Sequence, residues 1–163
     1  MELGMYFALD DSQAKRLLDQ VGTESLDDLL DEIEENDSAV LRCECDKAWD
    51  AILCALSPDG YERSDRTWPG HGVVLGERDL NVDVFDRLVS YSTPEAVQQV
   101  SDYLAGLSKD DFELLYGAMP EENRQDEYGT EECSYAWGWL EQVRSFFADA
   151  AEARLHVVFS AEY

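Results

Sequence analysis

Apolar residues recur along this chain with two spacings, one typical of strands and one typical of helices. Residues 4–9 form a short apolar and aromatic run, which predicts an N-terminal strand. Apolar residues three and four positions apart then predict three helices that each bury one side. Their stripes are Ala14, Leu17, Leu18 and Val21; Leu26, Leu29, Leu30 and Ile33; and Trp49, Ile52, Leu53 and Leu56. The first helix ends at Gly22, the second spans about 24–35, and Asp46 is a candidate N-cap for the third.

The second half of the chain continues this succession of short strands and helices. Three segments are expected to be strands, namely 72–77, 87–92 and 154–161. Thr93-Pro94-Glu95 places a capping residue, a proline at the first helical position and an early acid at the start of another helix. Ser108 caps a shorter helix, and the longest helix covers about 134–153.

The predicted elements fit one domain. The 163 residues suit a single hydrophobic core, and no repeat or long linker divides them, so 1–163 is expected to be one domain. Strands near both ends with helices grouped between them favour the α+β class, with a mixed sheet of short strands packed with about six helices. The polar stretch 59–72 is the longest ordered loop expected, and long loops in compact domains are often functional.

Charge is the most unusual property of the composition. Thirty-seven acidic residues against twelve basic ones leave a net charge of −25 at pH 7. Binding of nucleic acid through its phosphates is disfavoured, because it requires a basic surface, and an anionic membrane would repel the chain as well. Two interpretations of the charge stay open. It is either an adaptation to solubility, genome composition or salt, or a surface for a basic partner.

The chain shows no targeting feature. Its first residues lack a basic segment followed by a long apolar one, so no secretory signal is expected. No apolar run approaches the roughly 18 residues that a membrane-spanning helix requires. The four cysteines are expected to be reduced thiols, because the chain is long and carries no export signal. These features predict a cytoplasmic protein.

Several short segments occur in an order that resembles a known family. They are Gly4-Met5-Tyr6-Phe7, Asp46-Lys47-Ala48-Trp49, Val74-Leu75-Gly76-Glu77 and Tyr91-Ser92-Thr93-Pro94-Glu95-Ala96-Val97, followed by the aromatic last helix and the terminal strand. Together they resemble the YfbM-like proteins, a bacterial family of unknown function, over essentially the whole chain. The resemblance implies a mixed α+β cytosolic domain and supplies no catalytic residues. The acidic segments near 27–37 and 121–132 are expected to be peculiar to this member.

The sharpest candidate for a ligand site joins two parts of the chain. Asp46, Lys47 and Trp49 at a helix start would meet Glu77 at a strand end and His71 in the long loop, if the two elements are neighbours. Each residue also has a structural interpretation. Asp46 would cap the helix, and Trp49 would pack in the core. Glu77 would bond backbone groups or pair with Lys47. Both interpretations stay open at the level of the sequence.

The chain lacks the established catalytic and metal-binding patterns. Cys43-x-Cys45, Cys54, Cys133 and two histidines do not have the paired C-x-x-C spacing typical of structural zinc, so no metal and no cofactor is expected. Alternation along an extended segment would instead turn Cys43 and Cys45 to the same, core-facing side. Neither a nucleophile elbow nor a phosphate-binding glycine loop occurs.

A surface for a protein partner is the hypothesis that the composition favours. The helix at 24–35 carries acids on its outer side, and Trp137 lies off the apolar stripe of the longest helix, so it is expected to be exposed at an interface. The acids expected to form this partner surface are Asp27, Asp28, Asp31, Glu32 and Glu35. We therefore expect an uncharacterised, non-enzymatic interaction module, inhibitor- or immunity-like toward a basic protein, with self-association open. The alternative is a small-molecule-binding protein or enzyme with a pocket around Asp46, Trp49 and Glu77.

Overall fold

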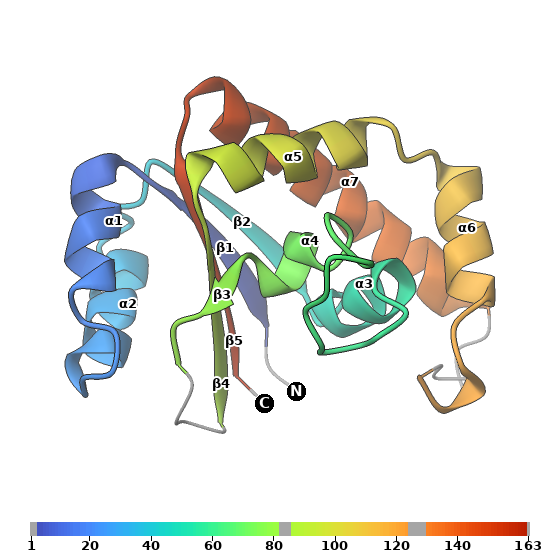
Figure 1. The fold of residues 1–163 in the computed structure, drawn as a ribbon, viewed down its shortest axis with the longest axis horizontal. Helices are drawn as coiled ribbons and strands as arrows, with labels where there is room; N and C mark the ends of the chain where they lie inside the picture. Colours follow the sequence, from blue (N-terminus) through green and yellow to red (C-terminus); the bar gives the residue numbers. More distant parts are fainter. Residues whose placement is uncertain (1–2, 82–85, 124–129, 163) are drawn as a thin grey trace.

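A five-stranded sheet organises the described part of the chain, which covers residues 3–81, 86–123 and 130–162 of a computed structural model. Its strands are β1 (Gly4–Leu9), β2 (Leu41–Asp46), β3 (Arg78–Asp79), β4 (Arg87–Ser92) and β5 (His156–Glu162), in the spatial order β2-β1-β5-β4-β3. All of these pairs are antiparallel, so the α+β class is confirmed, whereas the expected mixed sheet is wrong. The first and last strands lie side by side in the middle of the sheet (Figure 1).

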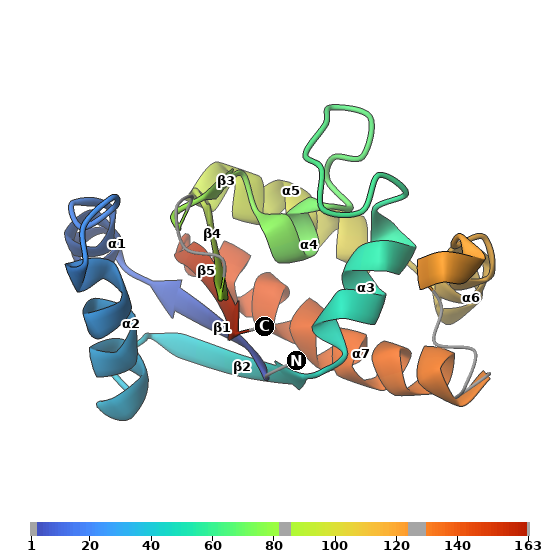
Figure 2. The ribbon, with the colours of Figure 1, turned by 90° about the horizontal axis from the view of Figure 1, so that it is seen from below.

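Seven α-helices and one short 3₁₀ turn complete the described residues. They are α1 (Asp11–Leu18), α2 (Ser25–Glu35), α3 (Trp49–Leu56), α4 (Gly72–Leu75), α5 (Pro94–Ala105), α6 (Lys109–Gly117), the turn Glu121–Asn123 and α7 (Thr130–Glu152). Helices α1 and α2 cover one face of the sheet, and α3 to α7 lie on the other (Figures 1 and 2). Within the described ranges, no helix combines the length and apolarity needed to cross a membrane.

Each face of the sheet has its own apolar core, because side chains of a strand point alternately to opposite faces. In β1, Tyr6 and Ala8 belong to the core under α3 to α7. Met5, Phe7 and Leu9 belong to the core under α1 and α2. All six residues of β1 are therefore buried. This double burial explains why the sequence of β1 is a continuous apolar run and not an alternating one.

Residues 72–77 form a helix and a turn, not the strand that their sequence predicts. Leu75 N–H donates to the His71 carbonyl at 2.8 Å, which closes the helical turn of α4. Gly76 ends the helix with a φ of +57°, and a Cβ there would lie 2.7 Å from the Tyr91 carbonyl oxygen. A short apolar run has no periodicity that distinguishes a strand from a buried helix, so tertiary contacts decide this segment.

Helix starts follow the predicted capping residues with one exception. Thr93 caps α5 and Ser108 caps α6, each by accepting a backbone N–H. Asp46 does not cap α3. It ends β2 with a φ of +49°, and α3 begins only at Trp49, without a side-chain cap.

Candidate ligand cleft beside the 59–71 loop

The five residues proposed as a ligand site lie in two separate places. Asp46, Lys47 and Trp49 surround the corner between β2 and α3, whereas His71 and Glu77 flank α4. β2 and β3, the strand that follows Glu77, are opposite edges of the sheet. Four strand spacings separate them, or ~19 Å. The structure therefore does not bring Asp46 and Trp49 together with Glu77 in one pocket.

Structural contacts account for Asp46 and Trp49. The Trp49 side chain is fully buried, and its ring centroid lies 5.9 Å from that of Phe159, so its expected place in the core is confirmed. The Tyr135 hydroxyl donates a hydrogen bond to Asp46, which ties the end of β2 to α7. Burial, followed by this bond, raises the pKa of Tyr135 to about 12. Lys47 is exposed beside this corner.

His71 and Glu77 line a common cleft between the 59–71 loop and the start of α5. The cleft has a volume of about 430 Å³, which is within the roughly 300–1,000 Å³ of small-ligand pockets. Its lining residues are Arg63, Ser64, Asp65, Trp68, His71, Glu77, Thr93, Glu95, Ala96 and Gln99. Two of the five proposed ligand residues thus share a site, with partners that the sequence pattern did not indicate.

Trp68 forms the aromatic wall of the cleft. Its indole N–H donates to Gln99 Oε1 at 2.6 Å, and its ring meets the His71 ring edge-on, with 5.3 Å between centroids. A Cβ on Gly72 would lie 2.5 Å from the Trp68 ring, so this close packing requires glycine. Contacts on both sides therefore position the ring, which stays half-buried at the cleft.

His71 presents one ring nitrogen to the cleft. Its Nδ1 lies 2.7 Å from the Thr67 hydroxyl, and only 4% of the residue is exposed. No described residue bonds its Nε2, and this atom is not fully buried, while the residue is part of the cleft lining. Burial, followed by the charge of Arg63, lowers the pKa of His71 below its usual range. The imidazole is therefore neutral at pH 7.

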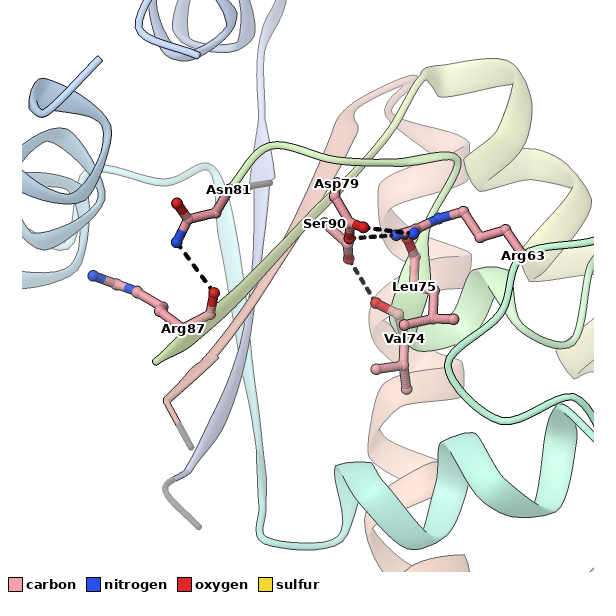
Figure 3. Close-up of polar contacts among 7 residues, drawn as sticks. All are labelled: Arg63, Val74, Leu75, Asp79, Asn81, Arg87 and Ser90. Atoms are coloured by element: carbon pink, nitrogen blue, oxygen red, sulfur yellow. Dashed lines mark hydrogen bonds and ion pairs between the residues drawn. The ribbon is translucent and has the colours of Figure 1, made fainter. Parts of the chain in front are cut away.

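Arg63 is the basic residue of the lining, and its charge is already engaged. The guanidinium forms two bonds to the Asp79 carboxylate, at 2.9 and 2.7 Å, and its Nε donates to the Leu75 carbonyl at 3.1 Å (Figure 3). Ser90 Oγ donates to the Val74 carbonyl at 2.6 Å on the same turn. These bonds attach the 59–71 loop and β4 to the end of α4, and they hold the cleft wall in place.

Three carboxylates line the cleft beyond this pair. Asp65 and Glu95 are exposed and form no ion pair within the described residues. Glu77 Oε1 accepts from the Thr93 N–H at 2.7 Å and from the Thr93 hydroxyl at 2.5 Å. Its Oε2 has no hydrogen-bond partner in the described part of the chain. The cleft is therefore a negatively charged site beside an indole ring.

The acidic face of α2 is partly occupied by contacts within the chain. Of the five acids expected at this surface, three pair with arginines, namely Asp27 with Arg87 at 3.7 Å, Asp31 with Arg87 at 3.1 Å and Glu32 with Arg16 at 3.1 Å. Asp28 and Glu35 are exposed and have no ion pair among the described residues. In the second acidic segment, residues 124–129 lie outside the described part of the chain.

Trp137 is buried, in contrast to the exposure that its sequence position predicts. Only 7% of the residue is exposed, and its ring centroid lies 5.6 Å from that of Phe112 in α6. The Arg144 guanidinium lies 5.0 Å from the ring on the same helix. Because α6 covers this side of α7, a position off the main apolar stripe becomes part of the core.

The cysteines of the described chain are protonated thiols. Cys43 and Cys45 both face inward from β2, as alternation predicts, and Cys45 is fully buried. Burial raises the pKa of Cys43 to about 11 and that of Cys54 to about 12, so neither is a thiolate at neutral pH. Among the residues that the structure describes, no group of three or more His, Cys, Asp and Glu is arranged to hold a metal ion.

Comparison with known families shows to which family the chain belongs. Residues 1–160 match the family described as "Domain of unknown function (DUF1877)". The chain belongs to this family. Its fold is similar to that of YfbM, a protein of unknown function from Escherichia coli, with a TM-score of 0.68 and 16% identity over 97% of this chain and 98% of that chain. The resemblance to the YfbM-like proteins is thus confirmed. No curated protein matches the chain.

The sequence indicated only part of this family member's cleft. The length of the 59–72 stretch, together with His71 and Glu77, pointed to the part of the chain where this cleft lies. Trp68 was missed as a lining residue, although it stands in the long polar loop, and binding residues are disproportionately found on loops. No local signal marks Gln99, which reaches the cleft only because α5 packs beside the loop.

Proposed function

We propose that this chain is a binding protein for a small organic cation, held in the cleft beside the 59–71 loop. The carboxylates of Asp65, Glu77 and Glu95 beside the Trp68 ring, in one cleft, carry this proposal. Carboxylates accept hydrogen bonds from ammonium and guanidinium groups, and an indole face attracts cations through its quadrupole. A cation with an amine or guanidine head is therefore the ligand class that matches the site.

The neutral His71 adds a ring nitrogen that accepts a hydrogen bond from a cationic N–H group. The Thr67 hydroxyl lies 3.2 Å from the Ser64 carbonyl oxygen. When the hydroxyl donates to this oxygen, it accepts from His71 Nδ1–H, which leaves Nε2 as an acceptor toward the cleft. Together with the free Oε2 of Glu77, two acceptors are thus available to the N–H groups of a bound cation.

The charge balance also favours a cation over an anion. Arg63 is the one basic residue among the described residues of the lining, and Asp79 already neutralises it. The net charge of −25 raises the local concentration of cations around the whole molecule. An anionic ligand would meet three carboxylates without a free positive partner.

Titration calorimetry with agmatine and putrescine at physiological salt tests the proposal. We expect saturable one-to-one binding of at least one of these cations, and none of citrate or glucose. Glu77→Gln keeps an acceptor for Thr93 but removes the charge, so binding should weaken by about five-fold, the upper range for an exposed ion pair. Trp68→Leu should weaken binding by about 2- to 30-fold through loss of the cation–π contact.

Glu152→Gln is the matched control for these titrations. It removes one exposed charge from α7, outside the cleft lining. A general effect of net charge would weaken binding equally in Glu77→Gln and Glu152→Gln and would disappear at high salt. Equal weakening, or the absence of binding for every cation, would contradict the proposal.

A basic protein partner at the acidic face of α2 is our second proposal. The exposed carboxylates of Asp28 and Glu35 support it, because they have no basic partner among the described residues. An inhibitor- or immunity-like role is one form that such an interaction would take. The bacterial origin, the cytoplasmic location and self-association stay predictions.

A further inference from the structure

The open edge of the sheet is a second candidate binding surface. β2 is an outer strand, so on one side its backbone has no partner strand within the described chain. Helix α7 runs alongside β2 in both views (Figures 1 and 2), and the bond between Tyr135 and Asp46 joins the two elements at one end. A groove of about 640 Å³ lies between them.

One face of α7 and the outer part of β2 form the walls of this groove. The helix contributes Gly138, Glu141, Gln142, Ser145, Phe146 and Asp149, which recur at the spacing of one helical face. The strand contributes residues 41–44. Leu41, Cys43 and Phe146 belong to the apolar core beneath, so they supply an apolar base. A Cβ on Gly138 would meet nothing within 4 Å, which leaves that end open.

The charged residues of the groove are mainly acidic. Glu44, Glu141 and Asp149 line it, and none of them forms an ion pair among the described residues. Within the described part of the chain, Arg42 is the one basic residue of this lining, and it lies 3.7 Å from Asp37, which is outside the groove. The groove therefore offers a strand edge without a partner strand in the described chain, beside three carboxylates that form no ion pair there.

We propose that this groove binds an extended segment of a basic protein, which pairs with β2 as an additional strand. The outer backbone groups of β2, which face no partner strand within the described chain, supply the hydrogen bonds of such a strand addition. The carboxylates of Glu141 and Asp149 receive the basic side chains of the segment. The apolar base formed by Leu41 and Phe146 contacts the side chain that lies between the two basic residues of the segment.

The spacing of the two α7 carboxylates sets the motif of the segment. Glu141 and Asp149 are eight residues apart on the helix, which corresponds to ~12 Å along its axis. In an extended chain, residues i and i+4 point to the same face and lie ~13 Å apart. Two basic residues four positions apart therefore match the groove, whereas residues three positions apart point to opposite faces.

Synthetic peptides of threonine and valine that carry two lysines test the register. One has its lysines four positions apart, and the second has the same composition with the lysines three positions apart. Binding is followed by amide chemical shifts of the isotope-labelled full chain. We expect the first peptide to shift the amides of 41–46 and 138–149, and the second to bind about two- to five-fold more weakly. Methylation of the first peptide's backbone nitrogens should weaken it by about 2- to 10-fold through lost strand hydrogen bonds.

Variants of the chain identify the carboxylates. Glu141→Gln and Asp149→Asn should each weaken the matched peptide by about two- to five-fold, the range of an exposed ion pair. Glu152→Gln on the same helix lies outside the groove and should leave binding unchanged. Equal binding of both registers, shifts confined to other regions, or no binding would overturn the proposal. A dimer in sedimentation whose formation shifts the amides of 41–46 would also overturn it, because the occupant would then be a second copy.

Discussion

At the scale of single residues, backbone geometry limits what the β2–α3 corner tolerates. Asp46 has a φ of +49°, in a region that residues with a Cβ seldom adopt, although Asp and Asn tolerate it better than most. The register shift between Gly4 and Met5 lies directly opposite. The side chain of Asp46 also accepts the Tyr135 hydroxyl. One residue therefore both turns the chain and attaches α7.

Substitution of Asp46 separates these two roles. Asp46→Ala should lower the free energy of unfolding by about 1–2 kcal/mol, because it combines the left-handed penalty with the lost hydrogen bond. Asp46→Gly should cost less, since glycine adopts positive φ freely. Urea unfolding measures both values, and Tyr135→Phe serves as the control that removes only the bond. A glycine variant less stable than the alanine variant would contradict the backbone explanation.

Thiol reactivity is a second property decided residue by residue. With a pKa of about 11, Cys43 should react with iodoacetamide at pH 7 roughly 10²-fold more slowly than an ordinary thiol, since only the thiolate attacks. Peptide mapping by mass spectrometry, with glutathione as the internal reference, measures this rate. Rapid labelling of Cys43 in the folded chain would show that burial does not protect it.

At the scale of elements, α2 is attached to the sheet by charge as well as by its apolar stripe. Leu26, Leu29, Leu30 and Ile33 are buried against the sheet, as the periodicity predicts. Arg87 of β4 reaches α2 and pairs with Asp27 and Asp31, and only 10% of its side chain is exposed. The acidic face is therefore not uniform. Part of it holds the fold together, and part of it forms no ion pair among the described residues.

Paired substitutions on α2 distinguish these parts. Asp27→Asn with Asp31→Asn should lower the free energy of unfolding by about 1–2 kcal/mol, because Arg87 loses its ion pairs in a largely buried position. Asp28→Asn with Glu35→Gln removes the same charge and should leave stability unchanged or slightly higher. Urea unfolding of both double variants is the measurement. If a basic protein binds this face, the second double variant should weaken the complex without loss of stability. Equal destabilisation by both would contradict this division.

At the scale of the whole molecule, the packing of the fold has to offset the repulsion among its excess negative charges. A net charge of −25 opposes compaction by self-repulsion, and the two apolar cores must offset it. Salt bridges cannot balance this charge, because only twelve basic residues are present and Arg63 and Arg87 are already engaged within the chain. The remaining carboxylates stay on the surface, including those of the cleft and the groove.

Stability should depend on the protonation of His71. Its folded-state pKa lies below the unfolded value near 6.5, so the unfolded chain takes up the proton first as the pH falls. The contribution of neutral His71 is thus fully present above pH ~6.5 and is lost as the pH falls toward the folded-state pKa. The free energy of unfolding, measured in urea at several pH values across this window, should fall more steeply for the native chain than for His71→Gln. Parallel curves for the two proteins would contradict the assignment.

Local patterns in the sequence determined the elements with one buried side. The stripes of α1 and α2 and the caps Thr93 and Ser108 predict helices that the structure contains, because periodicity and capping act over a few residues. The same holds for the inward positions of Cys43 and Cys45 on β2. The family and the α+β class also follow from the order of segments along the chain.

Only the tertiary structure decided which surfaces meet. It made 72–77 a helix and a turn, buried Trp137 under α6, and placed Asp46 and Glu77 at opposite edges of the sheet. It also brought Trp68 and Gln99 beside His71, and left β2 as an open edge next to α7. None of these outcomes follows from a local pattern. Strand order, and the packing of helices against one another, depend on contacts between residues far apart in the sequence.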